Sequence, residues 1–149
     1  MAGREVRELG PGESGLAFEA MRELRPGLAG EADFARRVDV LQRPQGYRLV
    51  AALDGGPVAA AVAGFRADHS LSWGSFLYVD DLSTLPSARR RGHAGALLDW
   101  LLEEAARLGC DQLHLDSGVG AERADAHRLY MSKGMVIAAH HFARAVPRG

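Results

Sequence analysis

Residues 81–102 read DLSTLPSARRRGHAGALLDWLL, and this stretch decides how the chain is expected to fold. It runs from the end of an apolar strand through a basic, glycine-bearing loop into a helix whose leucines recur at helical spacing. The start of a helix offers free backbone N–H groups and the positive end of the helix dipole. The stretch therefore predicts an anion site at the loop, with a solvated basic cap on a surface helix as the alternative.

The loop carries the side chains that binding of a phosphate or pyrophosphate requires. Gly92, Ala94 and Gly95 are small enough to let an anion approach the backbone, and residues 89–91 are three arginines with bidentate donors. The Walker pattern GxxxxGK[ST] and the dinucleotide pattern GxGxxG are both absent. The loop therefore argues against a nucleotide hydrolase and against a Rossmann-type dinucleotide site.

Alternating and helical periodicities extend the pattern in both directions from this loop. Strands are expected over residues 5–9, 47–53, 57–65, 73–84, 112–116 and 135–146. Helices are expected over residues 14–24, with Ser14 as N-cap, and over residues 31–42, 94–108 and 122–133. This order predicts an α/β (α+β) fold with a mixed sheet, formed by one domain over residues 1–149.

Composition narrows the class of protein. Of the 149 residues, 47% are hydrophobic and 25% are charged, which is typical of a soluble globular domain. With 18 basic and 19 acidic residues the formal net charge is -1, which argues against a nucleic-acid partner. No apolar run approaches the roughly 20 residues of a membrane span, and the N-terminus lacks a signal-peptide core. A cytoplasmic protein without a membrane partner is therefore expected.

Cysteine and histidine spacing predicts neither a disulfide nor a metal site. The one cysteine, Cys110, has no intrachain partner, and the six histidines show neither HxH nor HExxH spacing. We therefore expect no metal ion.

Two motifs together resemble the GNAT superfamily of N-acetyltransferases. Residues 89–94, RRRGHA, resemble the family loop [RQ]-x-x-G-x-[GA], whose amides hold the coenzyme A pyrophosphate. Residues 126–135, AHRLYMSKGM, resemble the later family segment A-x-x-[LF]-Y-x-x-x-G-[FM]. The order and spacing of the two motifs also fit the family. The resemblance implies a mostly antiparallel central sheet flanked by about four helices, and acetyl-CoA as co-substrate.

A narrower resemblance concerns a bacterial subgroup that includes aminoalkylphosphonate acetyltransferases. It rests on residues 115–118, LDSG, on residues 123–130, RADAHRLY, and on His141 followed by Phe142. Many superfamily members carry asparagine where Arg123 stands, and the departure suits this subgroup. Together, the resemblances imply that coenzyme A is bound by Leu82, Ser83, Thr84, Arg89, Arg90, Arg91, Gly92, His93, Ala94, Gly95, Ala96, Ser117, Arg123 and Tyr130.

The resemblance also implies direct attack of an amine on the thioester in a ternary complex. Tyr130 matches the family tyrosine near the sulfur, so it is expected to act as general acid, with a core aromatic as the alternative. Asp80 and Asp81 are both candidates for the base. Adjacent strand residues point to opposite faces, so one of them is expected in the cleft unless a bulge intervenes. His141, on the expected last strand, is a third candidate, with a half-buried sheet histidine as the alternative.

The acceptor is expected to be a primary amine of a small molecule. Its site is expected among the helices of residues 24–39, the loop of residues 67–73 and the last strand. The candidates to line it are Arg25, Glu31, Asp33, Arg36 and Trp73. Two alternatives stay open: a coenzyme A-binding sensor or interaction module without catalysis, and a protein or peptide N-acetyltransferase. The edge of the last strand also makes a homodimer a plausible assembly.

Overall fold

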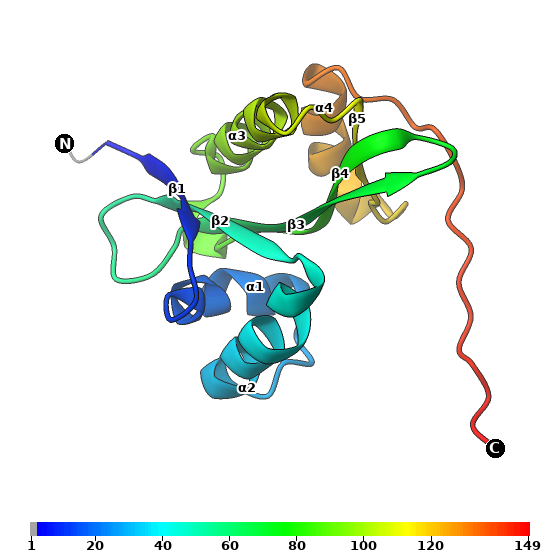
Figure 1. Ribbon diagram of the computed structural model, residues 1–149. Coiled ribbons are helices and arrows are strands. Elements are labelled where there is room, and N and C mark those ends of the chain that lie inside the picture. Colours follow the sequence, from blue (N-terminus) through cyan, green and yellow to red (C-terminus); the bar gives the residue numbers. More distant parts are fainter. Residues whose placement is uncertain (1–2) are drawn as a thin grey trace. The chain divides into compact units, whose positions relative to one another are not determined.

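A five-stranded sheet organises the fold in the computed structural model, which describes residues 3–149 (Figure 1). Its strands are β1 (Glu5–Leu9), β2 (Arg48–Leu53), β3 (Ala61–Ser70), β4 (Gly74–Thr84) and β5 (Gln112–Leu115). They lie in chain order, with β1 to β4 antiparallel and β5 parallel to β4. The expected mixed, mostly antiparallel sheet is confirmed.

Helices lie between β1 and β2, between β4 and β5, and after β5. The α-helices are α1 (Phe18–Leu24), α2 (Glu31–Arg36), α3 (His93–Arg107) and α4 (Ala124–Ser132). Short 3-10 turns are η1 (Ser14–Ala17), η3 (Arg43–Gln45), η4 (Pro86–Ala88) and η5 (Ala121–Arg123), and α2 continues as a π-helical segment, η2 (Arg37–Gln42). No helix within residues 3–149 is long and apolar enough to cross a membrane.

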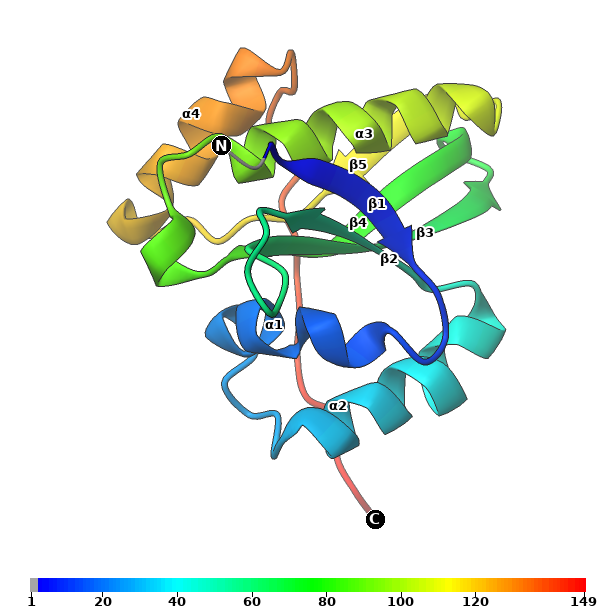
Figure 2. The ribbon, with the colours of Figure 1, turned by 90° about the vertical axis from the view of Figure 1, so that its left-hand side faces the viewer.

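Helices cover both faces of the sheet, with α3 on one face and α1 and α2 on the other (Figure 2). Consecutive residues of β2, from Leu49 to Ala52, are all fully buried, as a strand covered on both faces requires. Leu97, Leu98 and Leu101 form the buried stripe of α3, spaced as one face of a helix. The expected strand, loop and helix of residues 81–102 are confirmed.

Contacts between residues divide the chain into two units. The larger unit ends at Leu115 and contains the sheet with α1, α2 and α3, whereas the smaller unit is Asp116–Gly149 and contains α4.

Two expectations are wrong. Residues 135–149 form no strand, and Val136, Ile137 and Phe142 are each at least 75% exposed. The alternation of residues 135–146 suits a strand, but a strand also needs a neighbour with which to pair. Ser14 does not cap a helix: its hydroxyl donates to Asp39 Oδ1 at 2.7 Å instead.

Candidate active site

A bulge in β4 changes the alternation of its side chains. Gly64 of β3 lies opposite Asp81, but the next residue, Phe65, lies opposite Val79. Asp80 is therefore the extra residue of the longer strand. Without the bulge, Val79 and Asp81 would share one face of the sheet.

The bulge brings both carboxylates to the face that α1 and α2 cover. Phe65 packs its ring on α3, so the neighbouring Arg66 lies on the opposite face. Arg66 holds the carboxylate of Asp80 with two hydrogen bonds of 2.9 Å. Asp81 bonds to Arg25, which follows α1. Because of the bulge, the side chains of Asp80 and Asp81 therefore lie on the same face of the sheet.

Two donors fix the carboxylate of Asp81, whose side chain is only 12% exposed. The Arg25 guanidinium donates from Nε to Oδ1 at 2.9 Å, and the Tyr47 hydroxyl donates to Oδ2 at 2.7 Å. Arg25 also donates to the carbonyl of Asp80 at 3.0 Å, so it holds the bulge in place. Burial, and then the charge of Asp81, raise the pKa of Tyr47 well above its ordinary value. Tyr47 is therefore a protonated donor at neutral pH.

Gly64 makes room for this arrangement. A Cβ atom at Gly64 would overlap the hydroxyl and ring of Tyr47, which lies across β3 to reach Asp81. Any other residue at this position would therefore displace the tyrosine.

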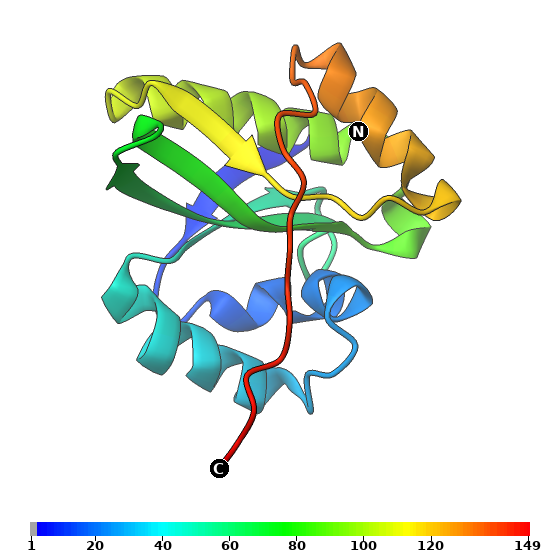
Figure 3. The ribbon, with the colours of Figure 1, turned by 90° about the vertical axis from the view of Figure 1, so that its right-hand side faces the viewer.

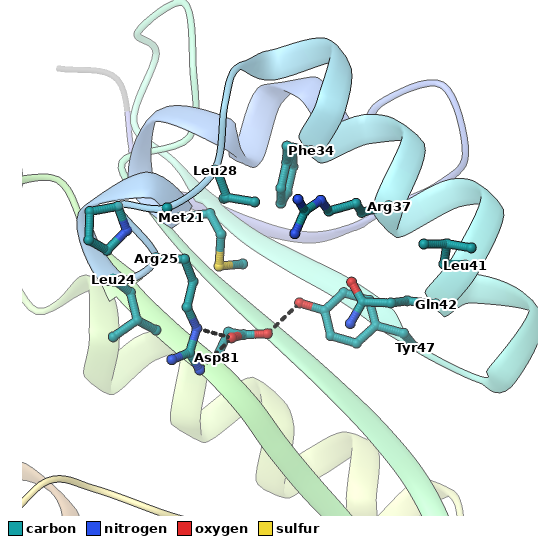
Figure 4. Close-up of a pocket in the computed structure, with 12 residues that line it drawn as sticks. Met21, Leu24, Arg25, Leu28, Phe34, Arg37, Leu41, Gln42, Tyr47 and Asp81 are labelled. Carbon is teal, nitrogen blue, oxygen red and sulfur yellow. Dashed lines mark hydrogen bonds and ion pairs between the residues drawn. The ribbon is translucent and has the colours of Figure 1, made fainter. Parts of the chain in front are cut away.

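Asp81 lies in a pocket of about 660 Å³ between β4 and the helical segments before β2 (Figure 4). This volume is within the range of small-molecule sites. Its lining residues are Met21, Leu24, Arg25, Pro26, Gly27, Leu28, Phe34, Arg37, Leu41, Gln42, Tyr47 and Asp81. The pocket therefore combines apolar walls with two guanidinium groups and one carboxylate.

The backbone of β4 is open along one edge beyond the bulge. β5 pairs only with Phe76–Val79, and β4 continues past the end of β5 (Figure 3). Leu85 donates its N–H to the carbonyl of Ala60 on the other edge. Antiparallel alternation then turns the backbone groups of Leu82 and Thr84 away from β3. Within residues 3–149, no strand pairs with these groups.

Ser83, expected to bind coenzyme A, has other partners. Its backbone lies in the ladder opposite Val62, and its hydroxyl donates to the carbonyl of Ala20 at 2.6 Å. This buried bond joins β4 to α1.

The basic loop leaves β4 through η4. Arg89, Arg90 and Arg91 are all exposed. Arg90 has φ of 64° and Gly92 has φ of 81°, so two residues of the loop adopt left-handed backbone. Only Gly92 adopts this conformation without a steric cost, and strain at a non-glycine residue such as Arg90 gathers at functional sites.

The backbone N–H groups at the start of α3 are unpaired within the helix. The first helical bond runs from the N–H of Ala96 to the carbonyl of Gly92 at 3.0 Å. The N–H groups of His93, Ala94 and Gly95 therefore lack a helical partner, and no side chain of residues 3–149 caps them. Three free donors beside three exposed guanidiniums suit a phosphate group.

The imidazole of His93 faces away from solvent and is only 5% exposed. Its Nδ1 lies 3.2 Å from Nη1 of Arg4, and its Nε2 lies 3.9 Å from Oδ2 of Asp54. Burial, and then the charge of Arg4, lower the pKa of His93. Only its backbone N–H, rather than its neutral side chain, is suited to hold an anion.

The smaller unit contains the remaining expected coenzyme A residues. Ser117 is held by His127, whose Nε2 lies 3.1 Å from the serine hydroxyl and 2.8 Å from the carbonyl of Gly118. Arg123 is exposed and precedes α4. Tyr130 is half-buried in the last part of α4, and burial raises its pKa. It is therefore a protonated phenol at neutral pH.

His141 lies in the segment without strand structure. Its Nδ1 is 2.8 Å from Oδ2 of Asp116, and both side chains are more than half exposed. The reason for expecting a base here, a position on the last strand, is therefore absent.

One of the residues expected to line the acceptor site lies in this pocket. Arg25 lines it as expected, but Glu31, Asp33, Arg36 and Trp73 do not. The lining residues that were not expected include Tyr47 and Arg37. No local pattern marks Tyr47, since its partner Asp81 is 34 positions away. Arg37 lies three positions after Phe34, so helical spacing places both side chains on one face of this segment and is the signal that could have found it.

The described part of the chain contains no cluster of side chains that could bind a metal ion. Within residues 3–149, no three histidine, cysteine, aspartate or glutamate side chains gather closely enough to hold an ion.

Comparisons with known proteins agree with this geometry. A model of the acetyltransferase (GNAT) family matches residues 16–135. The uncharacterized N-acetyltransferase YhdJ of Bacillus subtilis (strain 168) is 30% identical over 131 residues, covering 87% of this chain and 89% of that protein.

Solved structures share the fold at low sequence identity. The aminoglycoside N-acetyltransferase AAC(6')-Iy in complex with CoA has a TM-score of 0.79 at 16% identity, covering 97% of this chain and 95% of that chain. A transcriptional regulator from Bacillus halodurans C-125 has a TM-score of 0.81 at 18% identity, covering 97% and 100% of the two chains. These two likenesses bear on the fold alone.

Proposed function

Because the chain belongs to the acetyltransferase (GNAT) family, we propose that it transfers the acetyl group of acetyl-CoA to a primary amine of a small molecule. The amine attacks the thioester directly while both substrates are bound. The observation that carries this proposal is the place of Asp81, which lies in an apolar pocket one residue before the open edge of β4.

The donor would lie along the larger unit. The free amides of His93, Ala94 and Gly95 hold the pyrophosphate, with charge from Arg89, Arg90 and Arg91. The outward backbone groups of Leu82 and Thr84 pair with the pantetheine arm and hold the thioester beside the pocket.

Asp81 is the proposed base for the acceptor ammonium. A carboxylate within hydrogen-bond reach of an ammonium can hold it and accept its proton. Asp80 has a different role, because it does not line the pocket and its carboxylate is paired with Arg66. His141 is left out of the proposed mechanism because its imidazole pairs with Asp116 outside any strand.

Tyr130 is the proposed acid for the leaving thiolate, as the resemblance of its motif implies. The phenol holds its proton at neutral pH, so it is available when the thiolate forms. Ser117 and Arg123 stay proposed coenzyme A contacts on the same motif.

A small acceptor is favoured over a peptide because the pocket is walled by α1, α2 and η2. The narrower resemblance makes aminoalkylphosphonates one class of amine to test. The sensor alternative predicts coenzyme A binding without turnover.

The testing experiment is a thiol-release assay with acetyl-CoA against amino acids, aminoalkylphosphonates, polyamines, aminoglycosides and peptides. Gly92→Glu should abolish both turnover and the thermal shift that coenzyme A produces, because its side chain blocks the anion site. Tyr130→Phe should slow turnover and leave the thermal shift unchanged. Coenzyme A binding without turnover on any amine would favour the sensor, and no thermal shift would overturn the proposal.

A further inference from the structure

We propose that the acceptor is a small amphipathic zwitterion, a primary amine that carries one anionic group, carboxylate or phosphonate, on an apolar body. This inference rests on the proposed acetyl transfer and names the substrate class of the same pocket. It separates this chain from acetyltransferases whose acceptors are polycations.

The apolar body of the acceptor is inferred from the walls of the pocket. Met21 and Leu24 of α1, Leu28 of the connection, and Phe34 of α2 contribute apolar side chains. Figure 4 shows these side chains around the space above Asp81. Removing a branched aliphatic group from water against such walls is favourable.

The charged side chains that line the pocket indicate the charge of the acceptor. Arg25 and Arg37 contribute two guanidiniums, and Asp81 is the one lining carboxylate among residues 3–149. Arg25 is already bonded to Asp81. The lining itself thus carries more positive than negative groups, which disfavours a polycation such as an aminoglycoside or a polyamine.

Arg37 is the group that would receive the anion. An ion pair joins Nε of Arg37 to Oδ2 of Asp33 at 3.1 Å. Asp33 does not line the pocket. No hydrogen bond joins the terminal Nη atoms of Arg37 to another residue within residues 3–149. Figure 4 shows its guanidinium directed into the pocket beside Phe34, across the space from Asp81.

Asp81 and Arg37 thus give the pocket two poles. An ammonium placed at Asp81 is beside the open edge of β4, and an anionic group placed at Arg37 accepts paired bonds from the guanidinium. Lysine at position 37 would keep the charge but lose the paired geometry.

The experiment compares matched acceptors in the thiol-release assay: leucine, its phosphonate analogue, and 3-methylbutylamine, which lacks the anion. Spermidine and kanamycin represent polycations. We expect kcat/KM for leucine or its phosphonate analogue to exceed that for 3-methylbutylamine at least about tenfold, and Arg37→Gln to remove this difference through KM. Arg37→Lys should recover part of it. Arg36→Gln, an exposed neighbour outside the pocket, is the matched control and should change nothing.

Several results would overturn the inference. They are equal turnover of leucine, its phosphonate analogue and 3-methylbutylamine, a preference for spermidine or kanamycin, or an equal effect of Arg37→Gln on all amines. In each of these cases acetyl transfer itself would stand. If no amine is acetylated, acetyl transfer fails, and the pocket is still tested by calorimetry with 4-methylpentanoate, which has the anion and the apolar body but no amine. Binding that Arg37→Gln abolishes supports the inference, and absence of binding at millimolar concentration contradicts it.

Discussion

The hydroxyl of Tyr47 lies 2.7 Å from Oδ2 of Asp81, across a position at which only Gly64 leaves room. Tyr47 directly precedes β2, Gly64 lies in β3 and Asp81 lies in β4. The carboxylate in the pocket is therefore oriented by residues that are far apart in the sequence. Mutations at each of these positions should therefore act on the same group.

Gly64→Ala should lower both stability and activity. The new methyl group displaces the Tyr47 ring, so we expect a loss of about 1–3 kcal/mol in the free energy of unfolding and a lower kcat/KM. A double-mutant cycle with Tyr47→Ala, followed by urea unfolding, checks the cause. If Gly64→Ala costs as much without the tyrosine ring as with it, the overlap is not the reason.

Asp81→Asn should slow catalysis more than Asp80→Asn does. The first change removes the proposed base, for which we expect a loss of about 100-fold or more in kcat. The second weakens a pair with Arg66 and should cost less than about tenfold. Thiol release at saturating acetyl-CoA measures both, and a larger effect at position 80 would assign the base to Asp80.

Arg90→Gly and Gly92→Ala should change stability in opposite directions. Both residues have left-handed backbone, which costs a non-glycine residue about 1–2 kcal/mol. Arg90→Gly is therefore expected to raise the free energy of unfolding while weakening coenzyme A binding, because it removes a guanidinium. Gly92→Ala should lower stability. Urea unfolding and calorimetry with coenzyme A measure the two effects, and a destabilised Arg90→Gly would contradict the strain.

Glu104→Gln should destabilise the protein in a pH-dependent way. Glu104 is buried on α3, and its bonds to Arg107 and then Arg48 lower its pKa from 4.5 to about 2. A lowered pKa in the folded state adds stability above pH 4.5, and this stability is lost as the pH falls toward 2. We expect a difference of about 2 kcal/mol at pH 7 that shrinks across this window. Urea unfolding at pH 7, 4 and 3 checks it, and a difference independent of pH would assign the effect to packing.

The segment after α4 should mediate self-association. Ile137 is 75% exposed and Phe142 is 91% exposed, although both are large and apolar. We expect a homodimer in light scattering after size exclusion, shifted toward monomer in Ile137→Ser/Phe142→Ser. Leu71→Ser, at a fully exposed residue of the β3–β4 turn, is the control. A monomer at every concentration would contradict this prediction.

Local pattern was sufficient for most elements but insufficient for the pocket. Periodicity among neighbouring residues was enough to predict the start of β1 and the end of β4. Periodicity together with Gly92 was enough to predict α3. The bulge at Asp80 depends on which residues of β3 lie opposite, and the Arg25–Asp81 pair joins positions 56 apart. Such contacts are set by tertiary packing, which a single sequence does not display.

The missing last strand has a similar cause. Residues 135–146 alternate as a strand would, yet pairing depends on a partner edge that no local pattern specifies. The coenzyme A loop was predictable for the opposite reason, since its glycine, its arginines and the helix start are consecutive.

The bulge at Asp80 also determines how this strand should be varied in the laboratory. Before it, even-numbered residues such as Tyr78 face α1, and after it odd-numbered residues such as Asp81 and Ser83 do. A saturation library built on one uninterrupted alternation along β4 would randomise core positions against α3 in half of the strand. Libraries aimed at acceptor preference should take even positions up to 80 and odd positions from 81 onward.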